Sequence, residues 1–414
     1  MRDIELYRHL LGLESPWEVD RVDLSVAEGR VDVLVGHPRG CRWQCPSCDQ
    51  ELATYDHAEE RSWRHLDSCQ FLTYLRAKPP RVQCPEHGVQ QVRLPWAEPR
   101  SRFTSLFERL AVDVFKECDV TGAARILRLS WDEAWHLMER AVERGQQRKP
   151  ARDIAYLGVD EKSAGRGHDY ITLVSDLERS TVEYIADERK QASLDGYWDG
   201  LSDDQKAAVK AVAMDMWEPF AESVRTNLSD GDAKIVYDRF HIMGYAGKAV
   251  DTVRKTENRV LRGEQDATLV GSKYLWLYSE ENLPERHRDR FAQLCAQNLK
   301  TGRAWAMKES LRELWGYQSK TWGTKFWKQW FFWVTHSRLQ PMIDAARTLK
   351  RHLAGILNYF DHRITNAASE GINSRIQMIR YRARGYRNRR NFKTAIYFHC
   401  GGLDLYPATH SIPG

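Results

Sequence analysis

Three short apolar runs in the second half of the chain each lead directly into an aspartate. The runs are Tyr156 to Val159, Val212 to Met214 and Ile235 to Tyr237, followed by Asp160, Asp215 and Asp238. Continuous apolar runs of this length predict strands that are buried on both faces of a sheet. One aspartate after a strand is usually a turn or helix-capping residue. Three of them at the ends of parallel strands would lie at one edge, so the pattern favours an α/β sheet with an acidic site.

A fourth acid lies on a predicted amphipathic helix that begins near Asn366. Ile372, Ile376 and Ile379 form its apolar stripe, and Glu370 lies on the opposite face. A solvated polar face is the ordinary interpretation of such a residue. The cations that follow, with no acid among them, are Arg375, Arg380, Arg382, Arg384, Arg387, Arg389, Arg390 and Lys393. Such a run of positive charge is typical of a surface that binds the phosphate backbone of a nucleic acid. Carboxylates beside it suit Mg²⁺ (or Mn²⁺), two of which, roughly 4 Å apart, promote phosphodiester chemistry.

Cysteine usage indicates a metal site in the first hundred residues. The chain has eight cysteines, four of them between Cys41 and Cys69, and its first ten residues contain no apolar signal core. In a chain that is not exported, such clustering favours metal over disulfides. Two knuckles of matched spacing predict a closed, structural Zn²⁺ site. Its four ligands would be Cys45, Cys48, Cys84 and His87. Cys41 and Cys69 are spare candidates, and Cys41 could replace one of the four.

Helix-turn-helix spacing follows the cysteine-rich region. We expect a first helix over Thr121 to Leu127, a turn over Arg128 to Ser130 and a recognition helix over Trp131 to Arg144. Thr121 and Ser130 are the expected helix-capping residues. The candidate DNA contacts in this module are Arg125, Arg128, Arg140 and Arg144. Helix pairs are common in other proteins, so the spacing alone does not establish DNA binding.

Four motifs together resemble the ISL-three family of bacterial insertion-sequence transposases. They are Gly158-Val159-Asp160-Glu161, Met214-Asp215-Met216-Trp217, Asp238-Arg239-Phe240-His241 and Ser369-Glu370-Gly371-Ile372-Asn373-Ser374. The resemblance implies an RNase H-like fold whose DDE triad is Asp160, Asp215 and Glu370. Asp238 and His241 match a signature of Mutator-like transposases and are expected to support the site. Asp238 could also replace Asp215 as the second metal ligand.

The resemblance covers nearly the whole chain and implies a multidomain α/β protein. We expect an N-terminal helix and β-hairpin over 1–40, a zinc-binding domain over 41–100, a helix-turn-helix domain over 101–150, an RNase H-like catalytic domain over 151–240 and 366–402, and an α-helical insertion over 241–365. Six tryptophans lie between Trp305 and Trp333 in the insertion. Most should be core residues, as the helical spacing of Trp327 and Trp330 suggests, but one or two could stack on an unpaired base.

The preferred function is a DNA transposase that binds terminal inverted repeats and catalyses strand cleavage and transfer. The basic segment would contact DNA through Arg380, Arg382, Arg384, Arg387, Arg389 and Arg390. Transposon ends and target DNA are the expected partners, and pairing two ends implies a homodimer or larger assembly. A formal net charge of +5 permits a polyanion partner, and no apolar run approaches the roughly 18 residues of a membrane span. The resemblance implies a bacterial cytoplasmic protein that is nucleoid-associated when bound to DNA. The alternatives are a zinc-containing regulator with an inactive nuclease-like domain and a junction nuclease.

Overall fold

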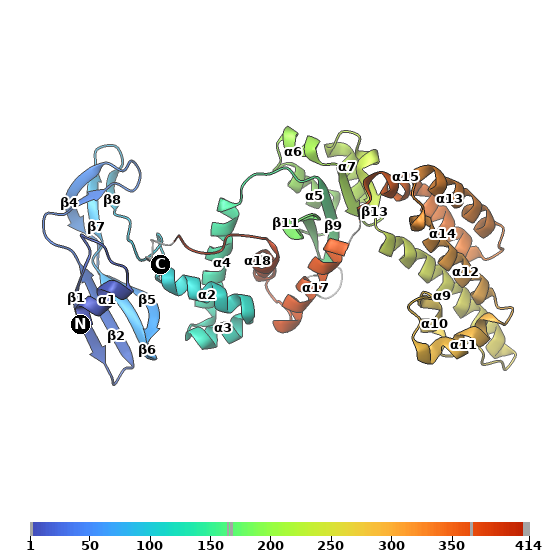
Figure 1. Cartoon of the computed structure of the whole chain (residues 1–414), viewed down its shortest axis with the longest axis horizontal. Helices are drawn as coiled ribbons and strands as arrows, with labels where there is room; N and C mark the ends of the chain where they lie inside the picture. Colours follow the sequence, from blue (N-terminus) through green and yellow to red (C-terminus); the bar gives the residue numbers. More distant parts are fainter. Residues whose placement is uncertain (1–2, 164, 166–168, 365–366, 409–414) are drawn as a thin grey trace. The chain divides into compact units, whose positions relative to one another are not determined.

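The computed structural model describes residues 3–163, 165, 169–364 and 367–408 (Figure 1). The chain divides into two compact units. Unit 1 comprises residues 1–149, 382–384 and 397–414, and unit 2 comprises residues 150–381 and 385–396. Each unit therefore combines segments that are far apart in the sequence. Of the described helices, none is long and apolar enough to cross a membrane.

Unit 1 begins with helix α1 (Asp3–Leu10) and two four-stranded sheets. The first sheet has the order β1-β2-β6-β5, with β1 at Glu18–Ser25, β2 at Arg30–Gly36, β5 at Arg61–Ser68 and β6 at Phe71–Ala77. The second has the order β3-β4-β7-β8, with β3 at Arg42–Gln44, β4 at Glu51–His57, β7 at Pro80–Cys84 and β8 at Gly88–Gln91. Strand β6 pairs in parallel with β2 of the N-terminal hairpin. Residues 61–77, which were expected in the zinc-binding domain, therefore belong to the same sheet as the hairpin, and the boundary expected at residue 40 does not separate them.

Three helices follow the sheets of unit 1. They are α2 (Ser105–Glu117), α3 (Val120–Leu127) and α4 (Trp131–Arg148). Ser130 caps α4 in a capping box with Glu133, as the sequence predicts. The prediction that Thr121 caps the first helix of the pair is wrong. Asp119 does so, because its carboxylate accepts a hydrogen bond from the backbone N–H of Gly122 and the helix begins at Val120.

A late segment of the chain completes unit 1. Residues 397–408 include the end of α18 (Arg389–Cys400) and the extended residues that follow it. Phe398 packs edge-on against Phe115 of α2, and the Tyr406 hydroxyl donates to Asp113 and accepts from Lys116. A Cβ atom at Gly145 of α4 would lie 2.7 Å from Cβ of Leu403, so the segment needs a glycine there. The helix-turn-helix region is thus covered by residues that lie some 250 positions later.

Unit 2 is built on a five-stranded mixed sheet with the order β11-β10-β9-β12-β13. Its strands are β9 (Tyr156–Ser163), β10 (Tyr170–Asp176), β11 (Thr181–Asp187), β12 (Ala211–Met214) and β13 (Ile235–Tyr237). The first three pair antiparallel, whereas β12 and β13 run parallel to β9. The helices α5 (Gln191–Trp198), α6 (Asp203–Ala208), α7 (Glu218–Asn227) and α8 (Gly231–Lys234) connect these strands. The short, fully buried runs of β12 and β13 match the parallel strands that the sequence predicts.

A helical region separates β13 from α17 (Ala367–Arg382), the helix that carries Glu370. It contains α9 (Arg239–Gly263), α10 (Lys273–Leu277), α11 (Glu285–Cys295), α12 (Lys300–Arg312), a 3-10 turn (Glu313–Gly316), α13 (Lys320–Thr335), α14 (Gln340–Arg351), α15 (Leu353–Leu357) and α16 (Tyr359–His362). One apolar core runs from the sheet through these helices. The start of the last helix that was expected near Asn366 lies outside the described residues.

Candidate active site and zinc site

The register of the parallel strands brings the three aspartates into one row. Gly158 of β9 pairs with Ala213 of β12, and Tyr237 of β13 pairs with Met214. Continuing both registers by one or two residues aligns Asp160, Asp215 and Asp238 across three adjacent strands, which are spaced about 4.8 Å apart. The expectation that β9 ends at Asp160 is wrong, because its antiparallel pairing with β10 holds it extended to Ser163.

Asp215, Asp238 and His241 form a compact cluster at this row, with one ligand atom from each within 4.8 Å of the others. His241 Nε2 lies 2.7 Å from Asp215 Oδ1 and 3.8 Å from Asp238 Oδ2. Asp238 caps α9 by accepting a hydrogen bond from the Phe240 N–H, so the helix begins here and His241 lies in its first turn. Burial lowers the pKa of His241, but the bond to Asp215 and the three nearby carboxylates outweigh it and raise the pKa above its usual value.

Helix α17 reaches Asp160 through a polar residue that sequence analysis did not assign to the site. The Asn373 amide donates a short hydrogen bond to Asp160 Oδ2, and Lys162 Nζ lies 3.4 Å from the same oxygen. Gly158 allows this approach, since a Cβ atom there would lie 2.6 Å from the Ser369 hydroxyl of α17. The signal in the sequence was the spacing of Ser369 and Asn373, which places both residues on one face of the helix.

Glu370, the expected third acid, lines a cavity of about 390 Å³ together with Asp238. Phe240, Trp315, Tyr359, Arg239 and Arg312 also line this cavity. Glu370 itself is exposed, as its position opposite the isoleucine stripe predicts, whereas Ile372 and Ile376 are buried. The structure therefore clusters Asp215, Asp238 and His241. Asp160 contacts α17 through Asn373, and Glu370 lines the same cavity as Asp238.

The basic segment after Glu370 is less available than the sequence suggested. Arg389 pairs with Asp169 and Asp187, and Lys393 lies 2.8 Å from Asp187. Arg380 donates to the Ser163 carbonyl. The expectation of a free basic track is therefore wrong for Arg389 and Lys393, which pair with acids of β11 and of the connection before β10, and for Arg380, which is held by a backbone carbonyl. Exposed side chains remain at Arg382, Arg384, Arg387 and Arg390.

The two knuckles of unit 1 converge as expected. Ligand atoms of Cys45, Cys48, Cys84 and His87 all lie within 4.8 Å of one another. Cys48 Sγ lies 3.7 Å from Cys84 Sγ, which lies 3.4 Å from His87 Nδ1. The backbone N–H groups of Ser47 and Cys48 point at Cys45 Sγ and lower the pKa of that thiol. Three soft sulfurs and one imidazole are the donor set that tetrahedral Zn²⁺ prefers.

The spare cysteines lie apart from this cluster. Cys41 directs its Sγ to the Pro38 carbonyl at 3.0 Å, and Cys69 is exposed beyond the end of β5. The knuckle residues alone thus supply four converging donors.

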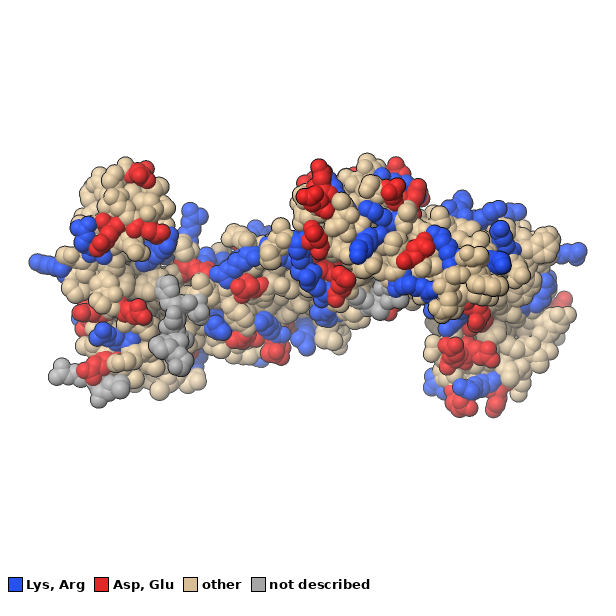
Figure 2. All heavy atoms as spheres, turned by 45° about the horizontal axis from the view of Figure 1, so that its top comes forward, with Lys and Arg blue, Asp and Glu red and all other residues tan. Residues whose placement is uncertain are grey.

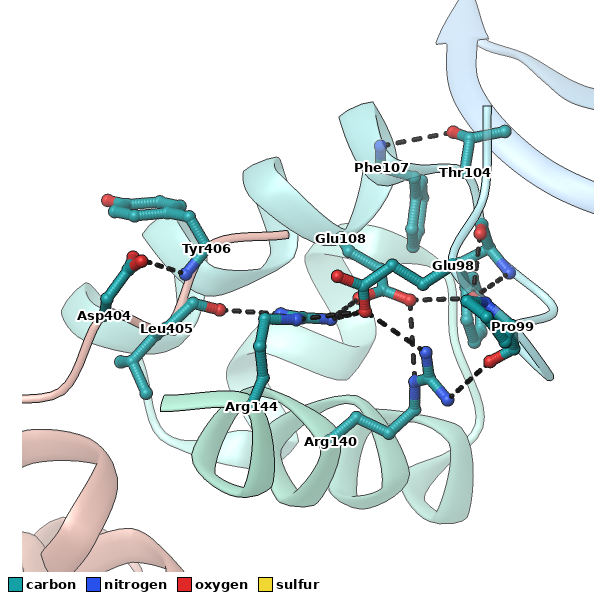
Figure 3. A network of polar contacts seen from close by, with 12 residues as sticks. Glu98, Pro99, Thr104, Phe107, Glu108, Arg140, Arg144, Asp404, Leu405 and Tyr406 are labelled. Carbon is teal, nitrogen blue, oxygen red and sulfur yellow. Dashed lines mark hydrogen bonds and ion pairs between the residues drawn. The ribbon is translucent and has the colours of Figure 1, made fainter. Parts of the chain in front are cut away.

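Two of the four arginines expected to contact DNA in the helix-turn-helix module are engaged inside unit 1 (Figure 3). Arg144 is buried, forms ion pairs with Glu98 and Glu108, and donates to the Leu405 carbonyl at 2.7 Å. Arg140 lies 3.5 Å from Glu98 and 3.6 Å from Glu108. These pairings speak against the expected DNA contacts, because both guanidinium groups neutralise the buried Glu108 and the partly buried Glu98.

The other two arginines of the helix-turn-helix module are more accessible. Arg125 is exposed on α3. Arg128 has a left-handed backbone conformation after α3, donates to the carbonyl and side chain of Gln70, and lies 3.5 Å from Asp67. Of the four predicted DNA contacts, Arg125 and, in part, Arg128 therefore present their charge on the surface.

Comparisons with known protein families match this arrangement along the chain. An ISL3 model described as "Transposase" matches residues 157–396. The "zinc-finger of transposase IS204/IS1001/IS1096/IS1165" matches residues 42–87, and the "Helix-turn-helix domain of transposase family ISL3" matches residues 92–142. These matches cover the zinc cluster, the helix pair and the acidic row.

Similar proteins span almost the full length of this chain. The transposase for insertion sequence element IS1557 of Mycobacterium tuberculosis is 26% identical over 417 residues, which cover 94% of this chain and 93% of that protein. The transposase for insertion sequence element IS1001 of Bordetella parapertussis is 27% identical over 397 residues, which cover 95% of this chain and 97% of that protein.

Proposed function

Since the chain belongs to the transposase family ISL3, we propose that it cleaves and joins DNA at the ends of an insertion sequence by a metal-dependent DDE mechanism. The observation that carries the proposal is the acidic row of unit 2. Asp160 lies on β9 and Asp215 follows the adjacent parallel strand β12, and among the described residues neither pairs with an arginine. Carboxylates held together without such a partner repel each other and are suited to a divalent cation.

An RNase H-like core is consistent with the topology of unit 2. Three antiparallel strands are followed by two that run parallel to the first, in the order β11-β10-β9-β12-β13. The acids that we assign to the triad lie on its first strand, after its fourth strand and on the late helix α17. We propose that the catalytic domain comprises residues 151–240 and the late segment from 366 to 396, with residues 241–365 as a helical insertion. Residues 397–402, which the sequence had placed in this domain, belong to unit 1.

We assign the binding of Mg²⁺ (or Mn²⁺) to Asp160, Asp215 and Glu370. Bound metal would activate water or a DNA 3′-hydroxyl and stabilise the leaving oxygen. Asn373 orients the Asp160 carboxylate through its short hydrogen bond. Asp238 fixes the start of α9 and so positions His241 against Asp215. No covalent enzyme intermediate is needed, because the nucleophile comes from water or DNA.

Unit 1 supplies the DNA-reading modules in this proposal. Its zinc ribbon is held by Cys45, Cys48, Cys84 and His87, and its helix-turn-helix presents Arg125 and Arg128. Exposed cations of the basic segment, among them Arg382, Arg384 and Arg387, would contact the DNA backbone. Because two transposon ends must be paired, we expect a homodimer or larger assembly on double-stranded DNA.

A nicking assay tests the proposed enzyme activity. The full chain is incubated with a supercoiled plasmid that carries the ends of its own insertion sequence, with Mg²⁺ or with a chelator. We expect nicking only with Mg²⁺, its loss in Asp160→Asn, and its retention in Asp203→Asn, a matched control on the exposed surface of α6. Specific end binding without Mg²⁺-dependent nicking would instead favour the DNA-binding regulator with an inactive nuclease-like domain.

Zinc content tests the assignment of the ribbon ligands. Cys84→Ser should lose the bound zinc and weaken binding of end DNA, because the metal and the fold of this module are linked. Cys295→Ser is the matched control, since Cys295 is a free, exposed cysteine of unit 2. Footprints on end DNA that survive complete removal of zinc would contradict a structural role for the metal in DNA binding.

A further inference from the structure

The outer face of α13 exposes large aromatic side chains. Trp322, Phe332 and Trp333 are 57%, 64% and 43% exposed, whereas Trp327 and Trp330 of the same helix are 3% exposed. Trp322 and Trp333 are eleven residues apart, about three helical turns, so they lie on one side of α13, and Phe332 is the neighbouring exposed ring. The buried pair explains how α13 joins the core. Of the exposed rings, Phe332 lies against the His336 ring, with centroids 4.0 Å apart, but all three keep a large exposed surface.

The segment that carries these rings is strongly basic. Residues 320–351 hold seven cations against one acid, an excess of six, whereas the whole chain has an excess of five. The cations are Lys320, Lys325, Lys328, Arg338, Arg347, Lys350 and Arg351, and the acid is Asp344. Figure 2 shows Lys and Arg side chains, with few acids, over the upper part of the helical region at the right. A surface with this balance attracts a polyanion.

The charges and the rings lie next to each other. Lys325 Nζ lies 4.4 Å from the ring centroid of Trp322. Within the part of the chain that the structure describes, Lys325 and Lys328 take part in no ion pair, so their charge is available to a ligand. Aromatic faces interleaved with cations are the arrangement by which proteins hold unpaired nucleotides, through stacking on bases and attraction to phosphates.

We propose that the outer face of α13, comprising Trp322, Lys325, Lys328, Phe332 and Trp333, binds a DNA strand whose bases are not paired. A surface for duplex backbone alone needs cations but no exposed tryptophan, because bases inside a duplex present no free face. The inference rests on the proposed function only in taking DNA as the substrate. It gives the helical insertion a substrate-binding role that is separate from the acidic row.

The test measures binding of a fluorescein-labelled oligo(dT) of about 20 nucleotides, long enough to span such a surface, by anisotropy in the full-length chain. The variant Trp322→Ala combined with Phe332→Ala should bind at least about tenfold more weakly, because stacking contributes strongly for each base. Binding should also quench tryptophan fluorescence in the wild type and less in the variant. Both substitutions are at exposed positions, and unchanged thermal unfolding checks that the variant folds.

Tyr274 offers a matched control within the same helical region. It is 68% exposed on α10, and Lys273 Nζ lies 5.4 Å from its ring centroid, so it has the same local chemistry away from the basic segment. Tyr274→Ala should retain oligo(dT) affinity within about twofold. Equal losses in the two variants would overturn the proposal, because exposed aromatic rings in general would then account for the binding.

A second copy of the chain is the other occupant that the exposed rings could accept. If the double variant changes the oligomeric state by light scattering without DNA and keeps its oligo(dT) affinity, the face is a protein interface and the proposal is wrong. The Asp160→Asn variant separates this result from the proposed function. It should bind oligo(dT) as the wild type does while losing nicking, whereas a failure of the DDE assignment would leave its nicking intact.

Discussion

Two clusters of charged side chains, one in each unit, differ in whether arginine neutralises their carboxylates. In unit 1, Glu108 is buried, accepts a hydrogen bond from the Ser101 hydroxyl, and forms ion pairs with Arg140 and Arg144 (Figure 3). In unit 2, strand register aligns Asp160 and Asp215, and the side chains that contact them are those of Asn373, Lys162 and His241, with no arginine among the described residues. Carboxylates neutralised by arginine hold a fold together, whereas carboxylates gathered without it are left to bind a cation.

The largest effect that we predict concerns the acidic row. Asp215→Asn and Glu370→Gln should each slow DNA cleavage by at least about 10³-fold, because a lost metal ligand removes several kcal/mol of charge stabilisation in the transition state. Urea unfolding of the same variants should show no loss of stability, since removing one acid relieves repulsion. Cleavage at the wild-type rate in either variant would remove that residue from the metal site.

In unit 1, by contrast, we expect the loss of a carboxylate to lower stability. Glu108→Gln should lower the free energy of unfolding by about 3 kcal/mol, the lower end for breaking a buried ion pair, because Glu98 still neutralises Arg144. Glu143→Gln, on the exposed side of α4, is the matched control and should change stability little. Denaturant unfolding measures both. Stability equal to that of the control would show that the buried network contributes little to holding unit 1 together.

Asp238 should show an intermediate effect. Asp238→Asn keeps a good helix cap for α9 but removes the charge near His241, so the substitution isolates the electrostatic role. We predict a loss of about 10²-fold in cleavage rate, comparable with the loss of a group that orients a metal ligand. If Asp238→Asn were inactive while Asp215→Asn remained active, Asp238 and not Asp215 would be the second metal ligand.

The smallest predicted effect is on the pH dependence of the stability of unit 1, through the buried His65. Burial, aided by the charge of Arg64, lowers the pKa of His65 to about 4. The unfolded chain therefore binds more protons than the folded one between pH 6.5 and 4, so stability is complete above about pH 6.5 and falls on acidification. Going from pH 7 to pH 5 should cost unit 1 about 2 kcal/mol through this residue. His65→Gln should lose that part of the pH dependence in thermal unfolding, and an unchanged dependence would contradict the assignment.

Features that depend on local spacing were predicted well from the sequence. The buried runs before Asp215 and Asp238 form parallel strands, the two knuckles bring four ligands together, and Ser130 caps α4. Each of these features begins from a motif whose residues lie within a few positions of one another: a buried run that ends at an aspartate, a Cys-x-x-Cys or Cys-x-x-His knuckle, or a capping box.

Features that depend on distant partners could not be predicted in this way. Arg144 looked like a DNA contact because its neighbours in sequence do not reveal Glu98 and Glu108, which lie 46 and 36 residues earlier. Arg389 and Lys393 likewise looked unpaired because their partner Asp187 is on β11. Helical periodicity indicates which face of a helix is polar, but it does not distinguish a solvated cation from one that neutralises an acid of another segment.

The return of residues 397–408 to unit 1 has a consequence for how the chain is synthesised. The ribosome makes the helix-turn-helix region first, but the residues that cover it, such as Phe398 and Leu405, emerge only after all of unit 2 has been translated. A chain interrupted just before residue 397 would retain Asp160, Asp215 and Glu370 yet lack the last part of its DNA-reading unit. Premature termination at that point would therefore leave unit 2 whole but unit 1 without the segment that packs on α2 and α4.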